Sequence, residues 1–336
     1  MIYALDSNCS VIGMIDQYAS AIWTVQFYGL GDFELITYPK YLDVLLPGNL
    51  LVKEADRQGT KAKNVMIIDE VTVNYDVENG NRVTVRGKSL KSILNKRIVW
   101  SQLNINDTVE NAIRQVVDAN MITCEDERKL PIRLGSLNGF TDTIETQLFG
   151  ENIGDWISSV CNQYGLGWDV ILDDGMVLEL YKTEEKNVVF SPKFGNLYSA
   201  DLKFANEYTA ALIGGEGEGT AQKTATIGTA TGMDRNEVYI DGSGVSSNGE
   251  IITVATYTEL LKQYGEEQLA SMLSNTSCAC EIDAYGIFKL GVDYFLGDKV
   301  KLEITGVNAL AIITEIIYSE DEQGVKVLPT FSNWEI

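Results

Sequence analysis

The sequence predicts a β-rich α+β protein of more than one domain. Its first hundred residues alternate apolar and polar side chains between turn residues, which is typical of strands with one buried face. The apolar period changes to that of helices in three later stretches, and strand-like alternation returns near the C-terminus. At about 100 to 200 residues per domain, 336 residues indicate two or three domains.

The clearest strand signal is the alternation of valine and tyrosine with polar residues over 71–77. Asn79-Gly80 follows it and favours a tight turn into a second strand at 83–85. A second hairpin is expected where Asp173-Asp174-Gly175 separates two apolar runs.

Three stretches have the spacing of amphipathic helices. The first begins near Asp107, with Asp107 and Glu110 placed as an N-cap and its reciprocal partner. The apolar positions of the three helices are Val109, Ile113, Val116 and Val117; Ile153, Trp156, Ile157 and Val160; and Leu260, Leu261, Tyr264, Leu269, Met272 and Leu273.

Two segments near opposite ends of the chain resemble each other. In the first, Pro-Gly-Asn-Leu-Leu-Val at 47–52 is followed by Ile-Ile-Asp-Glu-Val at 67–71. In the second, Leu-Gly-Asp-Lys-Val at 296–300 is followed by Ile-Ile-Thr-Glu-Ile at 312–316. Gly-Asn and Gly-Asp are turn dipeptides that lead into a strand. A duplicated domain and a chance likeness of common strand-turn-strand patterns both stay open on these residues alone.

Charge and composition exclude several functions. The net charge of −22 disfavours a partner, such as duplex DNA, that needs a broad cationic surface. The absence of histidine removes the serine and cysteine triads and the commonest zinc ligand. The cysteines are odd in number, form no C-x-x-C pair and are expected to be free thiols: Cys9, Cys124, Cys161, Cys278 and Cys280.

The chain shows no sign of secretion or of membrane insertion. Its N-terminus lacks a basic region followed by an apolar core, and polar residues interrupt the apolar stretch at 307–318. We therefore expect a soluble protein that is not secreted by a signal peptide and does not bind membranes by itself.

The glycine-rich run Gly214–Gly219 could be taken for a phosphate-binding loop. It lacks the Lys-Ser/Thr of a P-loop, and its two glutamates would repel an anion. We expect residues 214–232 to form a long exposed loop instead.

Three other groups of residues have both a chemical and a structural interpretation. The carboxylates Asp169, Asp173, Asp174 and Glu179 could form a calcium site or a glycosidase pair, but the predicted hairpin explains the turn carboxylates. A solvated helix face explains a basic cluster better than a nucleic-acid patch, and core or subunit packing explains the tryptophans better than a sugar platform. These residues are Lys88, Lys91, Lys96 and Arg97, and Trp100, Trp156 and Trp168.

Four blocks of sequence carry a family resemblance. They lie, in order, at residues 85–98, 232–241, 264–269 and 293–300, and together they resemble the siphovirus tail-tip hub family, which also occurs in prophages of Gram-positive bacteria. The structural signature residues within them are Gly87, Leu90, Arg97, Gly232, Arg235, Glu237, Gly297 and Asp298.

The resemblance implies a structural protein related in fold to the trimeric hub of contractile phage baseplates. Such a hub has two similar barrel domains per subunit, so that a homotrimer presents six barrels to a six-fold tail tube. The implied partners are distal tail or tail-tube proteins on one side and a spike or tail-fibre protein on the other, with DNA passing through the lumen unbound. The implied location is the virion tail tip, after assembly in the host cytoplasm.

The resemblance also implies no catalytic site, no cofactor and no metal. Larger hubs carry C-terminal fibre or peptidoglycan-cleaving domains, whereas this chain stops at Ile336. Two other functions remain open, namely a phage-derived cell-wall glycoside hydrolase and a receptor- or carbohydrate-binding tail module.

We accordingly predict four parts. Residues 1–100 form a first barrel-like domain, 101–195 an α+β module, 196–240 with 281–336 a second barrel-like domain, and 241–280 a helical insertion.

Overall fold

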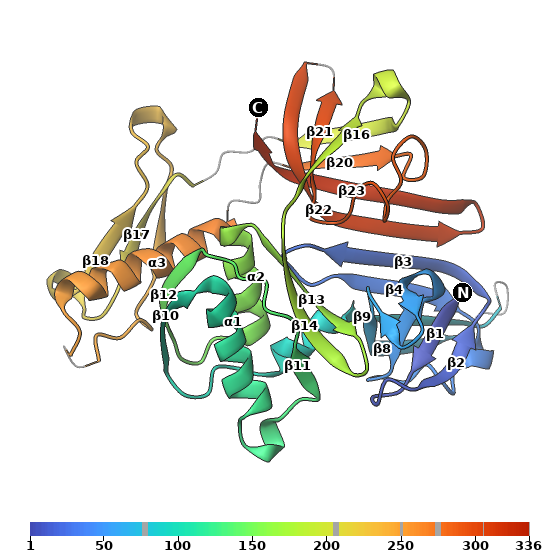
Figure 1. Ribbon diagram of the computed structural model, residues 1–336, viewed down its shortest axis with the longest axis horizontal. Helices are drawn as coiled ribbons and strands as arrows, with labels where there is room; N and C mark the ends of the chain where they lie inside the picture. Colours follow the sequence, from blue (N-terminus) through green and yellow to red (C-terminus); the bar gives the residue numbers. More distant parts are fainter. Residues whose placement is uncertain (76–79, 204–207, 249–250, 273–276, 305, 336) are drawn as a thin grey trace.

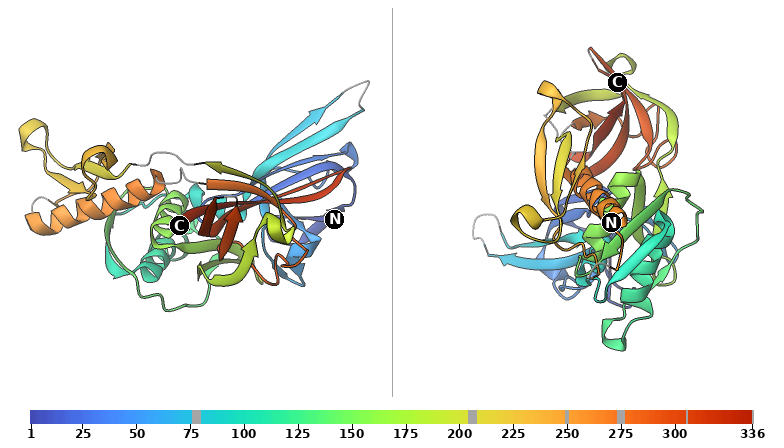
Figure 2. Two further views of the ribbon diagram at one scale, coloured as in Figure 1. Left: turned by 90° about the horizontal axis from the view of Figure 1, so that it is seen from above. Right: turned by 90° about the vertical axis from the view of Figure 1, so that its left-hand side faces the viewer.

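A large β-sheet runs through the protein and carries two smaller parts (Figure 1). The computed structural model describes residues 1–75, 80–203, 208–248, 251–272, 277–304 and 306–335. Figure 2 shows the β8–β9 hairpin (cyan) projecting at one end of the molecule and a part built on the helix α3 (orange) at the other.

Thirteen strands form the large sheet within the described residues. Most lie in the order β16-β20-β23-β22-β3-β4-β9-β8-β5-β1-β2, while β21 pairs with β22 and β15. Their bounds are β1 (Ile2–Leu5), β2 (Val11–Ile15), β3 (Tyr18–Gln26), β4 (Asp32–Thr37), β5 (Leu50–Lys53), β8 (Met66–Asn74), β9 (Arg82–Ser89), β15 (Glu185–Phe190), β16 (Leu197–Lys203), β20 (Ser277–Ile282), β21 (Lys299–Ile304), β22 (Val307–Asp321) and β23 (Gly324–Glu335).

The sheet confirms the β-rich α+β class. It does not confirm two barrel-like domains, because the pairings among the described residues close no barrel. The predicted turn residue Asn79 lies outside the described residues, but the flanking strands β8 and β9 do pair as an antiparallel hairpin.

Two groups of six strands within this sheet have the same arrangement. The first group lies in the order β3-β4-β9-β8-β5-β1 and the second in the order β16-β20-β23-β22-β21-β15. Strands that correspond in space also correspond in chain order. One difference is that β1 runs antiparallel to β5, whereas β15 runs parallel to β21.

The turns before β5 and β21 have the same conformation. Gly48 and Gly297 both have positive φ, at +91° and +90°, which glycine adopts without steric cost. In each turn the glycine N–H donates to an isoleucine carbonyl, and the N–H of that isoleucine donates to the carbonyl of the residue after the glycine. These bonds join Gly48 and Asn49 to Ile68 (2.8 and 2.9 Å) and Gly297 and Asp298 to Ile313 (2.8 and 3.0 Å).

The two groups also share register and β-bulges. One bulge lies in the Ile-Ile-x-Glu segment of β8 and of β22, where each strand pairs with its hairpin partner. Another follows Tyr18 in β3 and Leu197 in β16. Because a one-residue slip would move every side chain to the opposite face, matching bulges keep equivalent side chains on equivalent faces.

The sheet separates two hydrophobic cores. In β5, Leu50 and Val52 face the core shared with the α+β module, while Leu51 faces the core shared by the two strand groups. This alternation follows from the two-residue period of a strand.

The α+β module packs its helices on short sheets. Its helices are α1 (Val109–Val117), η4 (Asp118–Ile122) and α2 (Ile153–Tyr164), and η3 (Leu90–Lys96) leads into it. Its strands are β10 (Leu103–Thr108), β11 (Ile132–Leu134), β12 (Thr143–Leu148), β13 (Leu166–Leu172) and β14 (Met176–Lys182), and β13 also pairs with β7 (Lys61–Ala62), which pairs with β6 (Arg57–Gln58). Short helical turns occur at η1 (Pro39–Tyr41), η2 (Glu54–Asp56), η5 (Asp126–Arg128), η6 (Pro192–Phe194), η7 (Gly219–Ala221) and η8 (Gly232–Asp234).

The predicted N-cap of the first helix is wrong. Thr108, not Asp107, caps α1 by accepting a bond from the N–H of Asn111. Glu110 is buried and accepts bonds from the backbone N–H groups of residues 138–140. Its carboxylate therefore fixes a distant loop rather than the start of the helix.

A third hydrophobic cluster defines the part built on α3. It joins α3 (Val254–Met272) to a separate sheet of β17 (Ala210–Gly214), β18 (Thr224–Ile227) and β19 (Glu237–Asp241). Residues 210–240 therefore lie with the helix, not with the second strand group to which we assigned them. The expected single loop over 214–232 is also wrong, because it contains β18. Strand β15, which we assigned to the α+β module, belongs to the large sheet.

Candidate functional site

The eight signature residues lie in three separate places. At the first, Gly87 allows β9 to approach β8 closely, since a Cβ there would overlap the carbonyl oxygen of Ile67. Leu90 is buried at the start of η3. Arg97 follows η3, and its Nε donates to the carbonyl of Arg128 at 2.7 Å.

The second place is the loop before β19. Gly232 adopts a positive φ of +63°, and Arg235 pairs with Glu237 at 2.5 Å. The guanidinium also donates to the carbonyl of Ala230 at 3.1 Å. These contacts hold a surface loop in shape.

The third place is the turn before β21. The Asp298 carboxylate is buried and accepts a bond from the N–H of Phe295 at 2.8 Å, while burial raises its pKa. A Cβ on Gly297 would overlap the ring of Phe27, which directly follows β3. The turn of the second strand group thus packs against the first group.

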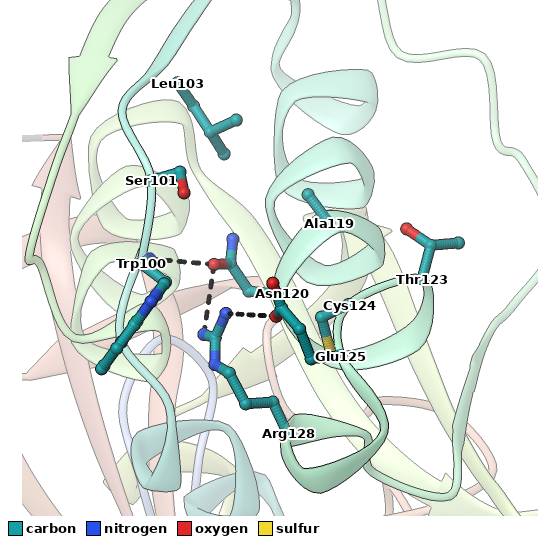
Figure 3. A pocket seen from close by; sticks show the side chains of 9 residues that line it. All are labelled: Trp100, Ser101, Leu103, Ala119, Asn120, Thr123, Cys124, Glu125 and Arg128. Carbon is teal, nitrogen blue, oxygen red and sulfur yellow. Dashed lines mark hydrogen bonds and ion pairs between the residues drawn. The ribbon is translucent and has the colours of Figure 1, made fainter.

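An open pocket of about 380 Å³ lies beside the first place (Figure 3). Trp100 forms one wall and is 60% exposed, and the Arg128 guanidinium lies 5.0 Å from its ring centroid. The buried Asn120 accepts bonds from the N–H of Trp100 (3.0 Å) and from Arg128 (3.4 Å). The lining residues are Trp100, Ser101, Leu103, Ala119, Asn120, Thr123, Cys124, Glu125 and Arg128.

This pocket combines an aromatic face with polar groups. Its lining has a single carboxylate, Glu125, which pairs with Arg128 at 3.7 Å. Glycoside hydrolysis ordinarily needs two carboxylates, so the pocket is better suited to binding than to hydrolysis. The signature residue Arg97 supports the pocket by holding the backbone of Arg128. Trp100 belongs to the tryptophans with a possible binding role in the sequence, whereas no sequence motif marks Asn120 or Arg128.

The other two tryptophans considered as a sugar platform, Trp156 and Trp168, are buried core residues. For the basic cluster at 88–97, the prediction of a solvated helix face is wrong at Lys91. This side chain is buried, with 3% of its surface exposed. Its Nζ donates to the carbonyls of Gln26 (2.9 Å) and Gly29 (2.6 Å) and lies 4.5 Å from the ring centroid of Trp168. Burial lowers the pKa of Lys91 to about 8. Lys91 therefore ties η3 to the end of β3.

The carboxylates considered from the sequence lie on the predicted hairpin, and Asp173 among them has charged partners. The predicted hairpin is confirmed, with β13 and β14 paired across a turn in which Asp174 has a φ of +52°. Asp173 pairs with Lys61 (3.2 Å) and with Arg133 (3.6 Å). In the described part of the chain, no three acidic or cysteine side chains are grouped so that they could hold a metal ion.

In the glycine-rich turn after β17, the carboxylate of Glu216 occupies the place that a bound anion would take. Glu216 accepts bonds from the N–H and Oγ of Ser247 at 2.7 and 2.5 Å, and Lys223 lies 3.4 Å away. These bonds lower the pKa of Glu216 to about 2. Ser247 and Lys223, which could otherwise bind a phosphate, are therefore already occupied by Glu216.

Helix α3 docks on helix α2 through side chain to backbone bonds. Ser159 and Asn162 of α2 donate to the carbonyls of Glu267 and Ala270, both at 3.0 Å. The Glu267 carboxyl is 2% exposed, and burial, with the nearby carboxylates of Glu151 and Glu266, raises its pKa to about 8.

Among the helices of the described residues, none is long and apolar enough to span a membrane.

The fold is that of known phage tail proteins. The prophage MuSo2 43 kDa tail protein from Shewanella oneidensis superposes with a TM-score of 0.61 at 14% identity, with 98% of each chain covered. A tail protein from Neisseria meningitidis MC58 superposes with a TM-score of 0.59 at 12% identity, over 99% of this chain and 96% of that one. Prophage tail protein gp18 from Listeria monocytogenes EGD-e superposes with a TM-score of 0.54 at 10% identity, over 99% of this chain and 94% of that one.

The sequence defines the family more specifically. Residues 1–332 match the family described as Siphovirus ReqiPepy6 Gp37-like protein, and the chain belongs to that family. A search of curated proteins gives no match.

Proposed function

We propose that this protein is a non-enzymatic hub at the tip of a phage or prophage tail. Three copies form a ring that joins a six-fold tail tube to a three-fold spike or fibre and lets DNA pass. Family membership and the tail-protein fold support a place in the virion tail.

The observation that carries this proposal is the correspondence between the two strand groups. Each chain offers two units of equal strand order and, apart from the direction of β1 and β15, of equal register and bulge position. A homotrimer then offers six such units, which allows three subunits to meet a six-fold partner.

Charge supports the passage of DNA. The net charge of −22 on each chain gives a trimer a net charge of −66. Carboxylates along a channel repel phosphates, so that DNA passes without binding. The same charge opposes assembly unless subunit contacts are apolar or paired.

Rising ionic strength is expected to favour the trimer. Between 0.01 M and 0.15 M salt the Debye length falls from about 30 Å to about 8 Å, which screens repulsion between subunits. Sedimentation across this range should show a species of three times 37.1 kDa that increases with salt. Duplex DNA should not bind at low salt. Appreciable DNA binding would contradict the repulsive channel.

The pocket beside Trp100 favours a second candidate function, a carbohydrate-binding tail module. Because sugars pack on aromatic faces, Trp100→Ala should weaken binding of purified cell-wall polysaccharide by roughly tenfold, about 1.4 kcal/mol. Calorimetry with Phe194→Ala, another exposed aromatic residue, provides the control. Equal affinities for both variants and the unmodified protein would exclude the pocket as a glycan site.

A further inference from the structure

In the part of the chain that the structure describes, the pairing of β22 with β3 joins the two strand groups. The second half of β22 runs antiparallel to β3, with Tyr318 opposite Trp23 and Ser319 opposite Ile22. The Nζ of Lys53 lies 4.9 Å from the Tyr318 ring centroid and 5.3 Å from that of Trp23. We call this pairing the internal joint.

Each half of the internal joint has an equivalent strand, and within the described residues that strand is unpaired on the corresponding side. The equivalent of β22 is β8, which beyond Ile67 pairs only with β9 among the described residues. The equivalent of β3 is β16, which in the same part of the structure pairs only with β20. Val73 and Tyr75 at the free edge are 54% and 80% exposed.

We propose that the free edge of β8 in one copy pairs with the free edge of β16 in the next copy and repeats the internal joint between subunits. The shared register of the two groups gives the pairs: Thr72 with Lys203, Val73 with Leu202, Asn74 with Asp201 and Tyr75 with Ala200. This inference rests on the proposed ring.

The side chains suit this pairing. Val73 meets Leu202 where the internal joint has Tyr318 against Trp23, so the central pair is apolar in both joints. Leu202 and Ala200 are only partly buried and pack on the same core as their equivalents Trp23 and Ala21, which are fully buried. None of the four pairs places like charges opposite each other.

The partner of each free edge is a second copy of this chain. The two free edges are different surfaces, so their contact is heterologous, and it closes into a trimeric ring if each copy is rotated by a third of a turn from the last. With the internal joint between units of one chain and the same joint between chains, three copies give six similar junctions. Exposed edge strands otherwise invite unspecific pairing, and the ring covers both of them.

A cysteine pair tests the register directly. In a Cys9→Ser/Cys124→Ser background, Asn74→Cys with Asp201→Cys should form disulfides between copies on mild oxidation. Non-reducing gels should show dimers and trimers that single variants do not give. Both residues are exposed, so folding should be retained. The matched positive control, Ile22→Cys with Ser319→Cys, places a pair at the equivalent position of the internal joint and should link without a mass increase.

The off-register pair Asn74→Cys with Tyr198→Cys should give a yield of disulfide-linked species at least tenfold lower than Asn74→Cys with Asp201→Cys. A trimer in sedimentation that yields no 74–201 disulfide, while the 22–319 control links, would overturn the edge pairing and leave the proposed ring standing. A monomer at every salt and protein concentration would overturn both. Val73→Lys should raise the concentration at half-assembly at least tenfold, and an unchanged value would contradict the joint.

Discussion

Gly87→Ala is expected to destabilise the protein by roughly 3 kcal/mol, at the upper end of overpacking effects. A Cβ at position 87 would overlap the Ile67 carbonyl and lie 2.9 Å from both the Asp69 nitrogen and Cε1 of Phe33. Two of these three atoms belong to the backbone of β8, so the strand pairing itself must shift. Chemical denaturation at one protein concentration measures the change.

Gly244→Ala is the matched control for this prediction. Gly244 is exposed, and a Cβ there meets nothing within 4 Å. It should change the free energy of unfolding by no more than about 0.5 kcal/mol. Equal stabilities of the two variants would mean that the close approach of β8 and β9 is not a constraint on the fold.

Sequence patterns predicted local structure well where the deciding residues are neighbours in the chain. The stripe over 153–160 gave α2, and Asp-Asp-Gly gave the hairpin of β13 and β14. The likeness of 47–52 to 296–300 pointed to two turns that do share φ and hydrogen bonds. In these cases the periodicity or the turn chemistry is itself the cause of the structure.

Features set by distant partners could not be predicted. Lys91 lies in a basic cluster, but its burial depends on Trp168 and on the carbonyls of Gln26 and Gly29 at and after the end of β3. Glu110 has the spacing of a capping residue, yet the loop at 138–140 binds its carboxylate. Nothing local marks either partner.

The correspondence of the two strand groups was visible in the sequence only in part. Equivalent strands such as β3 and β16 share a bulge and a register but little sequence. Strand pairing depends on alternating burial and backbone bonds, which many different side chains satisfy. The pocket was missed for a related reason, because Asn120 and Arg128 belong to no motif and meet Trp100 only in the fold.

Glu267→Gln is expected to stabilise the protein increasingly as pH rises from 5 to 8. Glu267 is buried, and its Oε1 has no hydrogen-bond partner among the described residues. Its backbone carbonyl accepts a bond from Ser159 of α2. An unfolded glutamic acid ionises near pH 4.5, whereas the folded pKa is about 8. The folded state therefore holds one more proton between these values, and its stability falls with pH across that window. Glutamine does not titrate and should remove this loss.

The groups that face Glu267 set the size of the effect. Gln263 favours the ionised carboxylate by hydrogen bonding, while Glu151 and Glu266 repel it. Charging a buried carboxyl in this setting should cost on the order of 1–3 kcal/mol. The free energy of unfolding of Glu267→Gln should therefore exceed that of the unmodified protein by about this amount at pH 8 and equal it at pH 5. Denaturation at pH 5, 6.5 and 8 measures it, with Glu259→Gln, an exposed glutamate of α3 that does not act on Glu267, as the control of equal charge. Faster hydrogen exchange of α3 at pH 8 in the unmodified protein, slowed by Glu267→Gln alone, would localise the effect to the α2–α3 contact. Parallel pH profiles for Glu267→Gln and the unmodified protein would show that this carboxyl does not titrate between folded and unfolded states.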